Sequence, residues 1–146
     1  VFDLPQALEV ARQTIAANGM SERVSVREGD FSKDDLGAGY DVVLAFNIIH
    51  AHSPEQNTAL LRKISDSLNE TGRIAILDQM AGKGLGPAAK ALVRLEALNF
   101  FNDLGARTYS FEEIGSWLRK AGFAGLKRVN LRKTPGFGLV LGTKAR

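Results

Sequence analysis

The hydrophobic positions of this chain fall into short unbroken runs and into longer stretches with a helical period. The clearest run covers residues 42–46, Val-Val-Leu-Ala-Phe, between Gly39 and the pair Ser53-Pro54. A short apolar run with β-branched residues and turn residues on both sides predicts a strand covered on both faces, as in a parallel α/β sheet. Ligands of such sheets bind beyond the carboxyl ends of the strands. The polar residues that follow Phe46 are therefore the first candidates for a functional site.

Further strands are predicted where apolar residues run together or alternate with polar ones. The segments with this pattern are 1–3, 23–28, 73–78, 125–131 and 137–142. The run before Asp78 is apolar throughout and, like the central run, ends at a polar residue. Only a handful of residues separate the last two strands, too few for a crossover helix, so this pair must be antiparallel.

Four segments have the spacing of helices with one apolar face. They cover residues 5–17, 54–68, 87–104 and 110–121. Pro5 suits the first turn of the first helix, and Ser110 with Glu113 forms the pattern of a capping box at the last. The apolar positions are Leu8, Ala11, Ile15, Leu60, Leu61, Ile64, Leu68, Leu92, Leu95, Leu98, Phe101, Ile114, Trp117 and Leu118. The order of elements predicts a doubly wound α/β sheet that ends in an antiparallel strand pair.

The composition sets limits on this picture. With 146 residues and 45% hydrophobic content the chain can bury one core, which predicts one domain. No apolar run approaches the roughly 18 to 20 residues of a membrane span, and the start at Val1 has no pattern of a secretory signal. The absence of cysteine excludes disulfides and thiolate metal sites and fits a reducing compartment, so we expect a cytoplasmic protein.

The net charge of +3 is unevenly distributed, because no acidic residue follows Glu113. The basic residues after it are Arg119, Lys120, Lys127, Arg128, Arg132, Lys133, Lys144 and Arg146. Nucleic acid or an acidic ligand could use such a segment. Its charges are interleaved with strand-like apolar positions and no aromatic stacking pattern accompanies them, which favours an ordinary solvated face and no nucleic-acid partner.

Six short motifs stand in a characteristic order along the chain. They are Phe-Asp-Leu-Pro at 2–5, Arg-Val with Gly-Asp-Phe at 23–31, Asn-Ile-Ile-His at 47–50 with Ser53 and Glu55, Gly-Arg-Ile-Ala-Ile-Leu-Asp at 72–78, Gly-Ala-Arg-Thr-Tyr-Ser at 105–110, and Trp-Leu with Ala-Gly-Phe at 117–123. With this order the chain resembles the S-adenosylmethionine-dependent O-methyltransferases of plant and bacterial secondary metabolism. The resemblance covers essentially all 146 residues.

The resemblance implies a fold, a reaction and a longer parent protein. The fold would be a Rossmann-like methyltransferase sheet with helices on both faces, a C-terminal antiparallel strand pair and its first strand missing. The reaction would be methyl transfer from S-adenosylmethionine to a hydroxyl of a small, aromatic or polyketide-like metabolite. Residues 1–146 would be a partial methyltransferase domain, without the glycine-rich cofactor loop and the N-terminal domain through which the parent would form a homodimer. We expect such a fragment to be inactive, to bind the cofactor poorly and to self-associate through its exposed sheet edge.

The resemblance also assigns cofactor-binding residues. Asp3 would accept the two ribose hydroxyls, although a helix N-cap before Leu4 explains its position equally well, and a nicotinamide dinucleotide would use the same acid. Asp30, followed by Phe31, offers an acceptor and an apolar plane for adenine, with a plain strand-ending turn as the alternative. The complete predicted set is Asp3, Leu4, Asp30, Phe31, Phe46 and Asn47.

His50 is the predicted general base. An acceptor hydroxyl must lose its proton, and imidazole is the side chain whose unperturbed pKa, about 6.5, suits this at neutral pH. A histidine that only lines the pocket is the alternative. In the plant enzymes Asp-Trp follows this histidine and a glutamate precedes the Arg-Thr pair, whereas Ala51-His52 and Ala106 stand here, so no orienting acid is evident.

The remaining site predictions concern the acceptor and other ligands. Asn99, Phe100 and Asp103 are expected to line the acceptor pocket, whereas Phe101 is expected to face the core. A metal site at His50 and His52 is not expected, because the sequence shows no third ligand in a suitable register. The loop with Gly82, Gly84 and Gly86 lacks the full dinucleotide-binding spacing, so no phosphate site is expected there.

Three other functions remain open at this stage. A non-catalytic methyltransferase-like binding module is favoured by the lack of an orienting acid and disfavoured by Asp3, Asp30 and His50. A nucleic-acid base methyltransferase usually has a Pro-Pro-aromatic motif after its fourth strand, and residues 47–50 do not match it. A dehydrogenase is disfavoured by the antiparallel pair at the end of the chain.

Overall fold

The structure, a computed structural model, describes residues 1–81, 86–105, 107–131, 133–134 and 136–145. Its contacts divide the chain into two compact units, Val1–Gly37 and Ala38–Arg146. The glycine loop predicted at residues 82–86 lies outside the described residues except for Gly86. Within the described residues, no helix is both long enough and apolar enough to cross a membrane.

The N-terminal unit contains one helix and a short parallel strand pair. Its elements are β1 (Phe2–Asp3), α1 (Pro5–Ala17) and β2 (Arg27–Glu28). Pro5 stands in the first turn of α1, where its missing N–H is no loss, and the left-handed Gly19 follows the helix end, as predicted. The strand predicted at 23–28 is shorter, because the N–H groups of Arg23 and Val24 donate to Met20 O in a turn.

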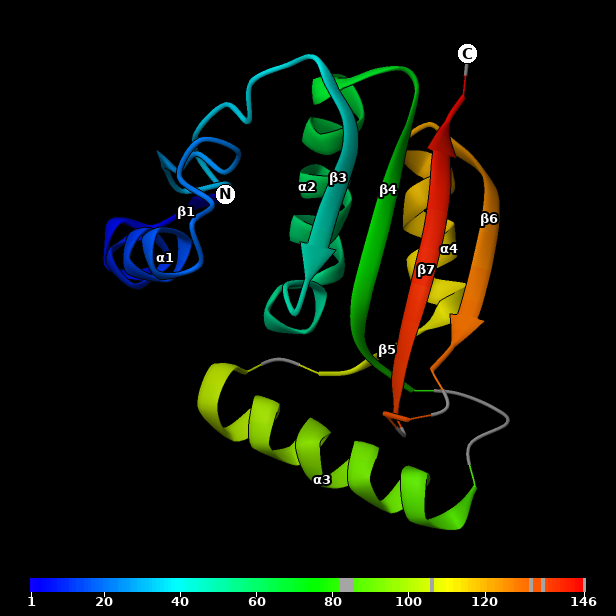
Figure 1. Cartoon of the computed structure of the whole chain (residues 1–146). Helices are drawn as coiled ribbons and strands as arrows, with labels where there is room; N and C mark the ends of the chain where they lie inside the picture. The colour runs from blue at the N-terminus through cyan, green and yellow to red at the C-terminus, as the bar shows by residue number, and fades with distance from the viewer. Residues whose placement is uncertain (82–85, 106, 132, 135, 146) are drawn as a thin grey trace. The chain divides into compact units, whose positions relative to one another are not determined.

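The C-terminal unit contains the larger sheet (Figure 1). Its elements are β3 (Tyr40–Phe46), the 3-10 turn η1 (Ile49–Ala51), α2 (Pro54–Ser67), β4 (Leu68–Ala81), α3 (Pro87–Leu104), β5 (Tyr109–Ser110), α4 (Phe111–Lys120), β6 (Phe123–Asn130) and β7 (Phe137–Lys144). The strand order is β3-β4-β7-β6, and β5 pairs with the end of β4. β3 and β4 are parallel, whereas β7 is antiparallel to both β4 and β6. The α/β class and the C-terminal antiparallel pair are thus confirmed.

The core of this unit lies between the sheet and two helices. α2 and α4 cover the same face of the sheet (Figure 1). Ile74, Ile76 and Val140 of the sheet are fully buried, and so are Leu61 of α2 and Leu118 of α4. Burying a side chain of this size contributes about 1.5 to 3 kcal/mol, so this layer fixes the position of β4 relative to both helices.

Two predictions about buried surfaces are wrong within this unit. Val42, Leu44 and Phe46 of β3 are 54%, 62% and 42% exposed, so β3 is not covered on both faces here. In α3 the expected apolar stripe is also exposed, with Leu95 at 55%. The reason is that α3 does not lie on a sheet face but runs across the end of the sheet at which β3 terminates (Figure 1).

One element boundary differs in an informative way. The sequence predicts a gap between the helix at 54–68 and the strand at 73–78, but α2 ends at Ser67 and β4 begins at once with Leu68. Thr71 has a φ of +62°, and the pairing with β3 shifts between Tyr40 and Val42. Polar residues that predict a turn therefore form an irregular strand start instead.

Candidate active site

The candidate site begins where β3 ends. Asn47 has a φ of +55°, a left-handed conformation that asparagine tolerates better than most residues, and its N–H donates to Leu77 O at 2.9 Å. This residue turns the chain out of the sheet and into η1, which contains His50. Because β4 is parallel to β3, its carboxyl end lies at the same edge of the sheet.

His50 is held by a buried carboxylate from β4. Its Nδ1 lies 2.8 Å from Oδ1 of Asp78, a residue that is only 1% exposed. A carboxylate only accepts, so Nδ1 carries the proton and donates. The backbone N–H groups of His50 and Gln79 also donate to Asp78, at 3.2 and 2.8 Å. The pair therefore fixes both the tautomer and the orientation of the imidazole.

Phe100 of α3 covers one face of the same imidazole. The two ring centroids are 4.0 Å apart and the planes differ by 10°, which is a stacked arrangement. The His50 side chain is 13% exposed, and no residue in the described part of the chain hydrogen-bonds its Nε2. Nε2 is therefore the atom that is left to exchange a proton with a ligand.

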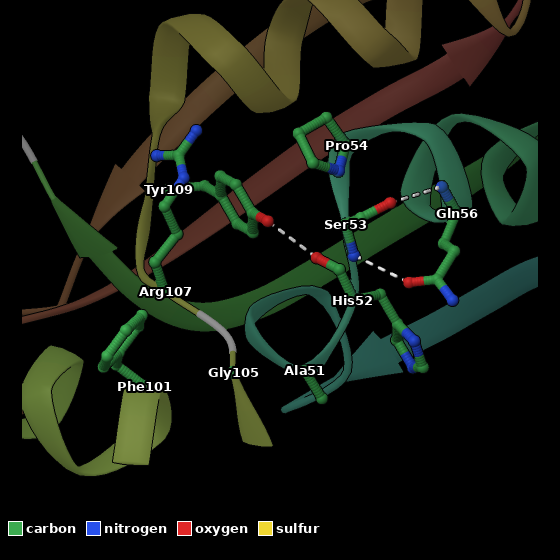
Figure 2. A pocket seen from close by; sticks show the side chains of 9 residues that line it. All are labelled: Ala51, His52, Ser53, Pro54, Gln56, Phe101, Gly105, Arg107 and Tyr109. Carbon is green, nitrogen blue, oxygen red and sulfur yellow. Dashed lines mark hydrogen bonds between the residues drawn. The ribbon is translucent and has the colours of Figure 1, made fainter. Parts of the chain in front are cut away.

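A pocket of about 360 Å³ lies beside this turn (Figure 2). Its lining residues are Ala51, His52, Ser53, Pro54, Gln56, Phe101, Gly105, Arg107 and Tyr109. Phe101 is 65% exposed and lines this pocket, so the expectation that it faces the core is wrong. Figure 2 shows the His52 ring directed away from Arg107 and Tyr109. His52 thus contributes its backbone, rather than its ring, to the side of the pocket near β5.

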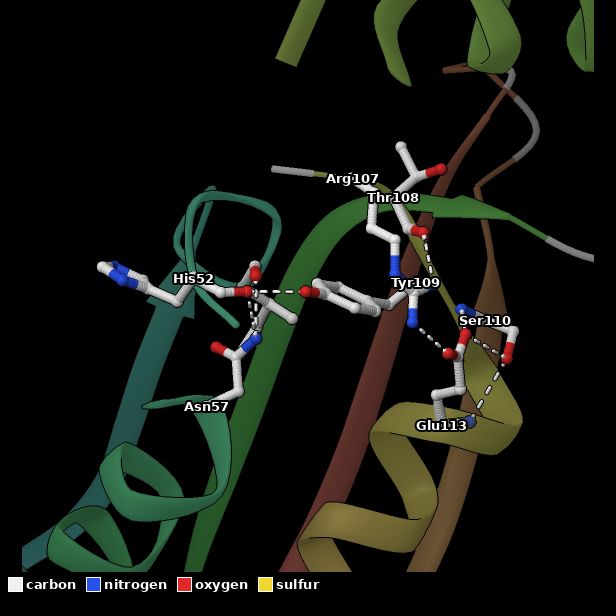
Figure 3. Close-up of polar contacts among 8 residues, drawn as sticks. His52, Asn57, Arg107, Thr108, Tyr109, Ser110 and Glu113 are labelled. Atoms are coloured by element: carbon white, nitrogen blue, oxygen red, sulfur yellow. Dashed lines mark hydrogen bonds and ion pairs between the residues drawn. The ribbon is translucent and has the colours of Figure 1, made fainter. Parts of the chain in front are cut away.

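The Arg107 side chain contacts residues at the start of α4. Its guanidinium lies 2.7 Å from Glu113 Oε1 and 4.3 Å from the centre of the Tyr109 ring (Figure 3). The hydrogen bond to Glu113 raises the pKa of Arg107. Burial acts to raise the pKa of Glu113, but hydrogen bonds from Arg107 and Ser110 lower it overall. The ion pair therefore stabilises the capping box of Ser110 and Glu113, which forms as predicted.

Asp3, in the N-terminal unit, is exposed, and its side chain binds the backbone of the next residue. Its Oδ1 accepts a hydrogen bond from Leu4 N–H at 2.8 Å. The N-cap residue of α1 is Leu4 and not Asp3, so the helix-cap interpretation of Asp3 is wrong. Its role in binding a cofactor stays a prediction.

Asp30 is bound to its own turn. Its Oδ1 accepts from the backbone N–H of Ser32 at 2.9 Å and from the Ser32 hydroxyl, and Lys33 Nζ lies 3.0 Å from Oδ2. These contacts, with the Ser32 hydroxyl first, lower the pKa of Asp30 to about 2. The geometry is that of a strand-ending turn, and the adenine-binding role of Asp30 and Phe31 stays a prediction.

The family of the chain can now be stated from comparison with known proteins. Residues 1–124 match the O-methyltransferase domain family. The chain belongs to this family.

Several relatives of this O-methyltransferase domain have established names. The chain is 32% identical over 150 residues to the L-tyrosine C(3)-methyltransferase of Streptomyces lavendulae, and the match covers 99% of this chain and 40% of that protein. It is 32% identical over 146 residues to the 3-hydroxy-5-methyl-1-naphthoate 3-O-methyltransferase of Streptomyces sahachiroi, covering 99% and 41%. The apo structure of the S-adenosylmethionine-dependent methyltransferase SibL matches with a TM-score of 0.88 and 35% identity, covering 100% of this chain and 43% of that one. The chain therefore spans about two fifths of these relatives.

Within the O-methyltransferase domain, the structure brings together some of the predicted residues and adds one that was missed. His50 and Phe100 meet, and Asn47 stands just before their turn. Asn99 is exposed on α3, Phe46 is 42% exposed, and the Asp103 side chain lies outside the described part. Asp3, Leu4, Asp30 and Phe31 belong to the N-terminal unit. The described residues contain no group of three His, Cys, Asp or Glu side chains that could hold a metal ion.

Asp78 is the functional residue that the sequence analysis missed. In the motifs of the plant O-methyltransferases an acid stands next to the histidine and another precedes the Arg-Thr pair, whereas this chain has Ala51 and Ala106 at those positions. The signal that could have found it is the acid at the end of the next parallel strand, because parallel neighbours end at the same sheet edge. The orienting acid is 28 residues away in the chain and 2.8 Å away in space.

Proposed function

We propose that the protein containing this chain transfers a methyl group from S-adenosylmethionine to a hydroxyl group of a small aromatic or polyketide-like metabolite. The observation that carries this proposal is the 2.8 Å contact between His50 Nδ1 and the buried Asp78, which leaves Nε2 to act as a base. Membership of the O-methyltransferase family supports it. A binding module without activity would not need such a pair.

The chain supplies the proton-transfer part of the reaction. S-adenosylmethionine, when bound, would supply an electrophilic methyl group on a sulfonium and would leave as the neutral thioether. His50 Nε2 takes the acceptor's hydroxyl proton as the oxygen forms its bond to the methyl group, which yields the methyl ether and an imidazolium. The Asp78 carboxylate stabilises this imidazolium, since opposite charges at 2.8 Å attract strongly in a buried site.

The residues at the strand ends fit the chemistry of the cofactor. The exposed carboxylate of Asp3 has one oxygen beyond the Leu4 contact for ribose hydroxyls, and the exposed ring of Phe46 offers an apolar surface. Leu4, which follows β1, and Asn47, which follows β3, would each add contacts from their own unit. Asp30 would share its carboxylate between Ser32 and the adenine amine, beside Phe31.

An aromatic acceptor fits the surroundings of His50. Phe100 stacks on the imidazole, and Phe101 adds exposed aromatic surface in the neighbouring pocket. Asn99 and Asp103 belong to α3, as Phe100 and Phe101 do, and would add polar contacts to the acceptor. One relative is named for a naphthoate substrate, which is an aromatic acid.

Transfer to carbon is the second candidate. The L-tyrosine C(3)-methyltransferase shows that a relative can methylate a ring carbon. Loss of a phenolic proton makes both the oxygen and the neighbouring ring carbon nucleophilic, so the same base serves both outcomes. NMR of the product decides between them, because an O-methyl and a C-methyl group have different chemical shifts and only the second removes a ring proton.

We further propose that the whole protein is a cytoplasmic homodimer, assembled through an N-terminal domain. The resemblance to O-methyltransferases and the absence of cysteine support this. Sedimentation of the longest natural polypeptide that contains this chain, with and without its first domain, tests the assembly. Loss of the dimer on removal of that domain is the expected result.

The test of the base uses the same polypeptide. His50→Ala is expected to lower kcat about a hundredfold or more, because general-base catalysis contributes about 10² to 10⁴. Cofactor affinity, measured by calorimetry, should stay within a factor of about two, since His50 acts on the acceptor. His52→Ala is the control and should matter less, because its ring points away from the Arg107 and Tyr109 side of the pocket.

Asp78→Asn is the second arm of this test. The amide keeps the shape of the side chain but loses the charge that stabilises the imidazolium, so kcat should also fall about a hundredfold. Asp66→Asn, an exposed site on α2, controls for loss of one acidic charge. If His50→Ala keeps most of its activity and an unchanged pH profile, the proposed mechanism is wrong.

A further inference from the structure

The turn that contains His50 is poorly held by its own backbone. η1 has three residues, and no side chain caps it. Its hydrogen bonds are long, 3.2 Å from Ala51 N to Ile48 O and 3.4 Å from His52 N to Ile49 O. Turns of this kind have poorer hydrogen-bond geometry than α-helices. The position of the imidazole therefore depends on contacts that come from outside the turn.

Asn57 of α2 supplies two of these contacts. Its Nδ2 donates to Ile49 O at 2.9 Å and to His52 O at 3.1 Å, the carbonyls on either side of His50 and Ala51 (Figure 3). The residue is 0% exposed, and its Oδ1 has no partner among the described residues. A buried amide oxygen without a partner destabilises the folded state. The two N–H donors of the Asn57 amide therefore account for its burial, because both bind carbonyl oxygens of the turn.

Tyr109 of β5 supplies the third contact, from the opposite side. Its hydroxyl donates to the same His52 O at 2.7 Å (Figure 3). The ring is 3% exposed and packs edge-on against Trp117, with centroids 4.8 Å apart. Burial raises the pKa of Tyr109, so the hydroxyl keeps its proton and donates. The Tyr109 hydroxyl, on a ring that packing against Trp117 holds in place, is therefore hydrogen-bonded to the turn.

We propose that Asn57 and Tyr109 act together as positioning residues, a clamp on His52 O that keeps His50 Nδ1 on Asp78 and its Nε2 turned toward the acceptor. Neither residue needs to touch the reacting atoms. The clamp joins three separate elements of the chain, α2, η1 and β5. Its effect on turnover rests on the proposed function, but its effect on the His50 to Asp78 hydrogen bond does not.

Two substitutions separate positioning from stability. Asn57→Leu removes both donors and also removes the unpaired oxygen, so the two effects on stability oppose each other. Tyr109→Phe removes one oxygen and keeps the packing against Trp117. Ser67→Ala is the matched control, since Ser67 is a buried residue of α2 whose hydroxyl donates to a carbonyl, Ile64 O at 2.8 Å, far along the helix from the turn.

The first measurement is the NMR signal of the His50 Nδ1 proton in this chain, identified by its loss in His50→Ala. We expect it to be sharp in the wild-type chain and in Ser67→Ala, and to exchange faster with water in Asn57→Leu, Tyr109→Phe and the double variant. The second measurement is turnover of the longest natural polypeptide. Misplacing a reacting group by about 1 Å costs about a hundredfold, so each variant should lose about tenfold to a hundredfold in kcat, with the cofactor KM unchanged.

The outcomes are distinct. A double variant that keeps both the protected Nδ1 signal and its kcat overturns the clamp. If Asn57→Leu does not fold, Tyr109→Phe alone decides, because it deletes a single oxygen. If the wild-type polypeptide transfers no methyl group, the proposed function is wrong, and if His50→Ala keeps its turnover, only the role of His50 as the base is wrong. In both cases the exchange of the Nδ1 proton still supports or overturns the clamp.

Discussion

At the scale of single residues, local contacts explain why the pKa of the Asp30 carboxyl group is lowered. Its carboxylate is fixed by Ser32 and Lys33, which lower its pKa from the ordinary 3.8 to about 2. A carboxyl group whose pKa is lower in the folded state stabilises the fold above its ordinary pKa, and this contribution disappears as the pH falls through the folded value. The contribution of Asp30 ionisation to stability is therefore complete above about pH 3.8 and is lost only in strongly acidic solution, between about pH 3.8 and pH 2.

This gives a prediction for Ser32→Ala. Because the Ser32 hydroxyl is the largest cause of the lowered pKa, the substitution should raise the pKa of Asp30 toward its ordinary value. An NMR titration of the Asp30 carboxyl carbon measures both values. Ser21→Ala serves as the control for a serine in the same unit. An Asp30 pKa near 3.8 in the wild-type chain would show that the carboxylate is free to bind a ligand.

The active-site residues show which contacts a sequence can reveal. His50 was predicted because a polar residue after a buried strand marks a site in parallel sheets. Asp78 gave no signal in the motif around His50, because this acid comes from the end of the neighbouring parallel strand β4. Asn57 gave no signal, since an asparagine within a helical period reads as a solvent-facing position. Contacts between separate elements depend on which strands pair and where the helices pack, and the period within one segment does not specify this.

At the scale of elements, the capping residues were the most reliable signals. Ser110 accepts from Glu113 N–H at 3.2 Å, and Ser110 N–H donates to Glu113 Oε2 at 2.9 Å, as the Ser-x-x-Glu pattern predicts. These contacts join neighbouring residues, so local sequence is sufficient to specify them. The face that a helix buries is less predictable. In α3 Val93 is buried while Leu95 is exposed, because the helix crosses the sheet end and has no sheet face beneath it.

The capping box gives a prediction for α4. Ser110→Ala removes the acceptor for Glu113 N–H, so the free energy of unfolding should fall by about 1 kcal/mol, the usual value of a helix N-cap. Urea denaturation followed by circular dichroism measures the change. Ser116→Ala, in the middle of the same helix, should leave the stability nearly unchanged or raise it slightly, because alanine is the better helix former. Equal effects of the two substitutions would show that the cap does not stabilise α4.

At the scale of the whole molecule, the two edges of the larger sheet differ. β6 forms one edge, which is interrupted by a register shift between Ala124 and Lys127 and has the exposed charge of Lys127. Bulges and lysines of this kind prevent pairing with another chain. β3 forms the other edge and presents Val42, Leu44 and Phe46, all more than 40% exposed. Among the described strands, only β4 pairs with β3. One edge is therefore protected, and the other is a template for a further strand.

This asymmetry predicts that the isolated chain self-associates through β3. Light scattering at increasing concentration should give a mass above that of the 15.8 kDa monomer. Leu44→Lys should return the chain to a monomer, because a lysine in the middle of β3 places a charge in the proposed contact, where pairing would desolvate it. Val10→Lys is the control, since Val10 is exposed to a similar degree, 64% against 62%, but lies on α1. A wild-type chain that stays monomeric at high concentration would show that the β3 edge does not pair. If Val10→Lys removes the association as well as Leu44→Lys does, general hydrophobicity rather than the open strand edge is its cause.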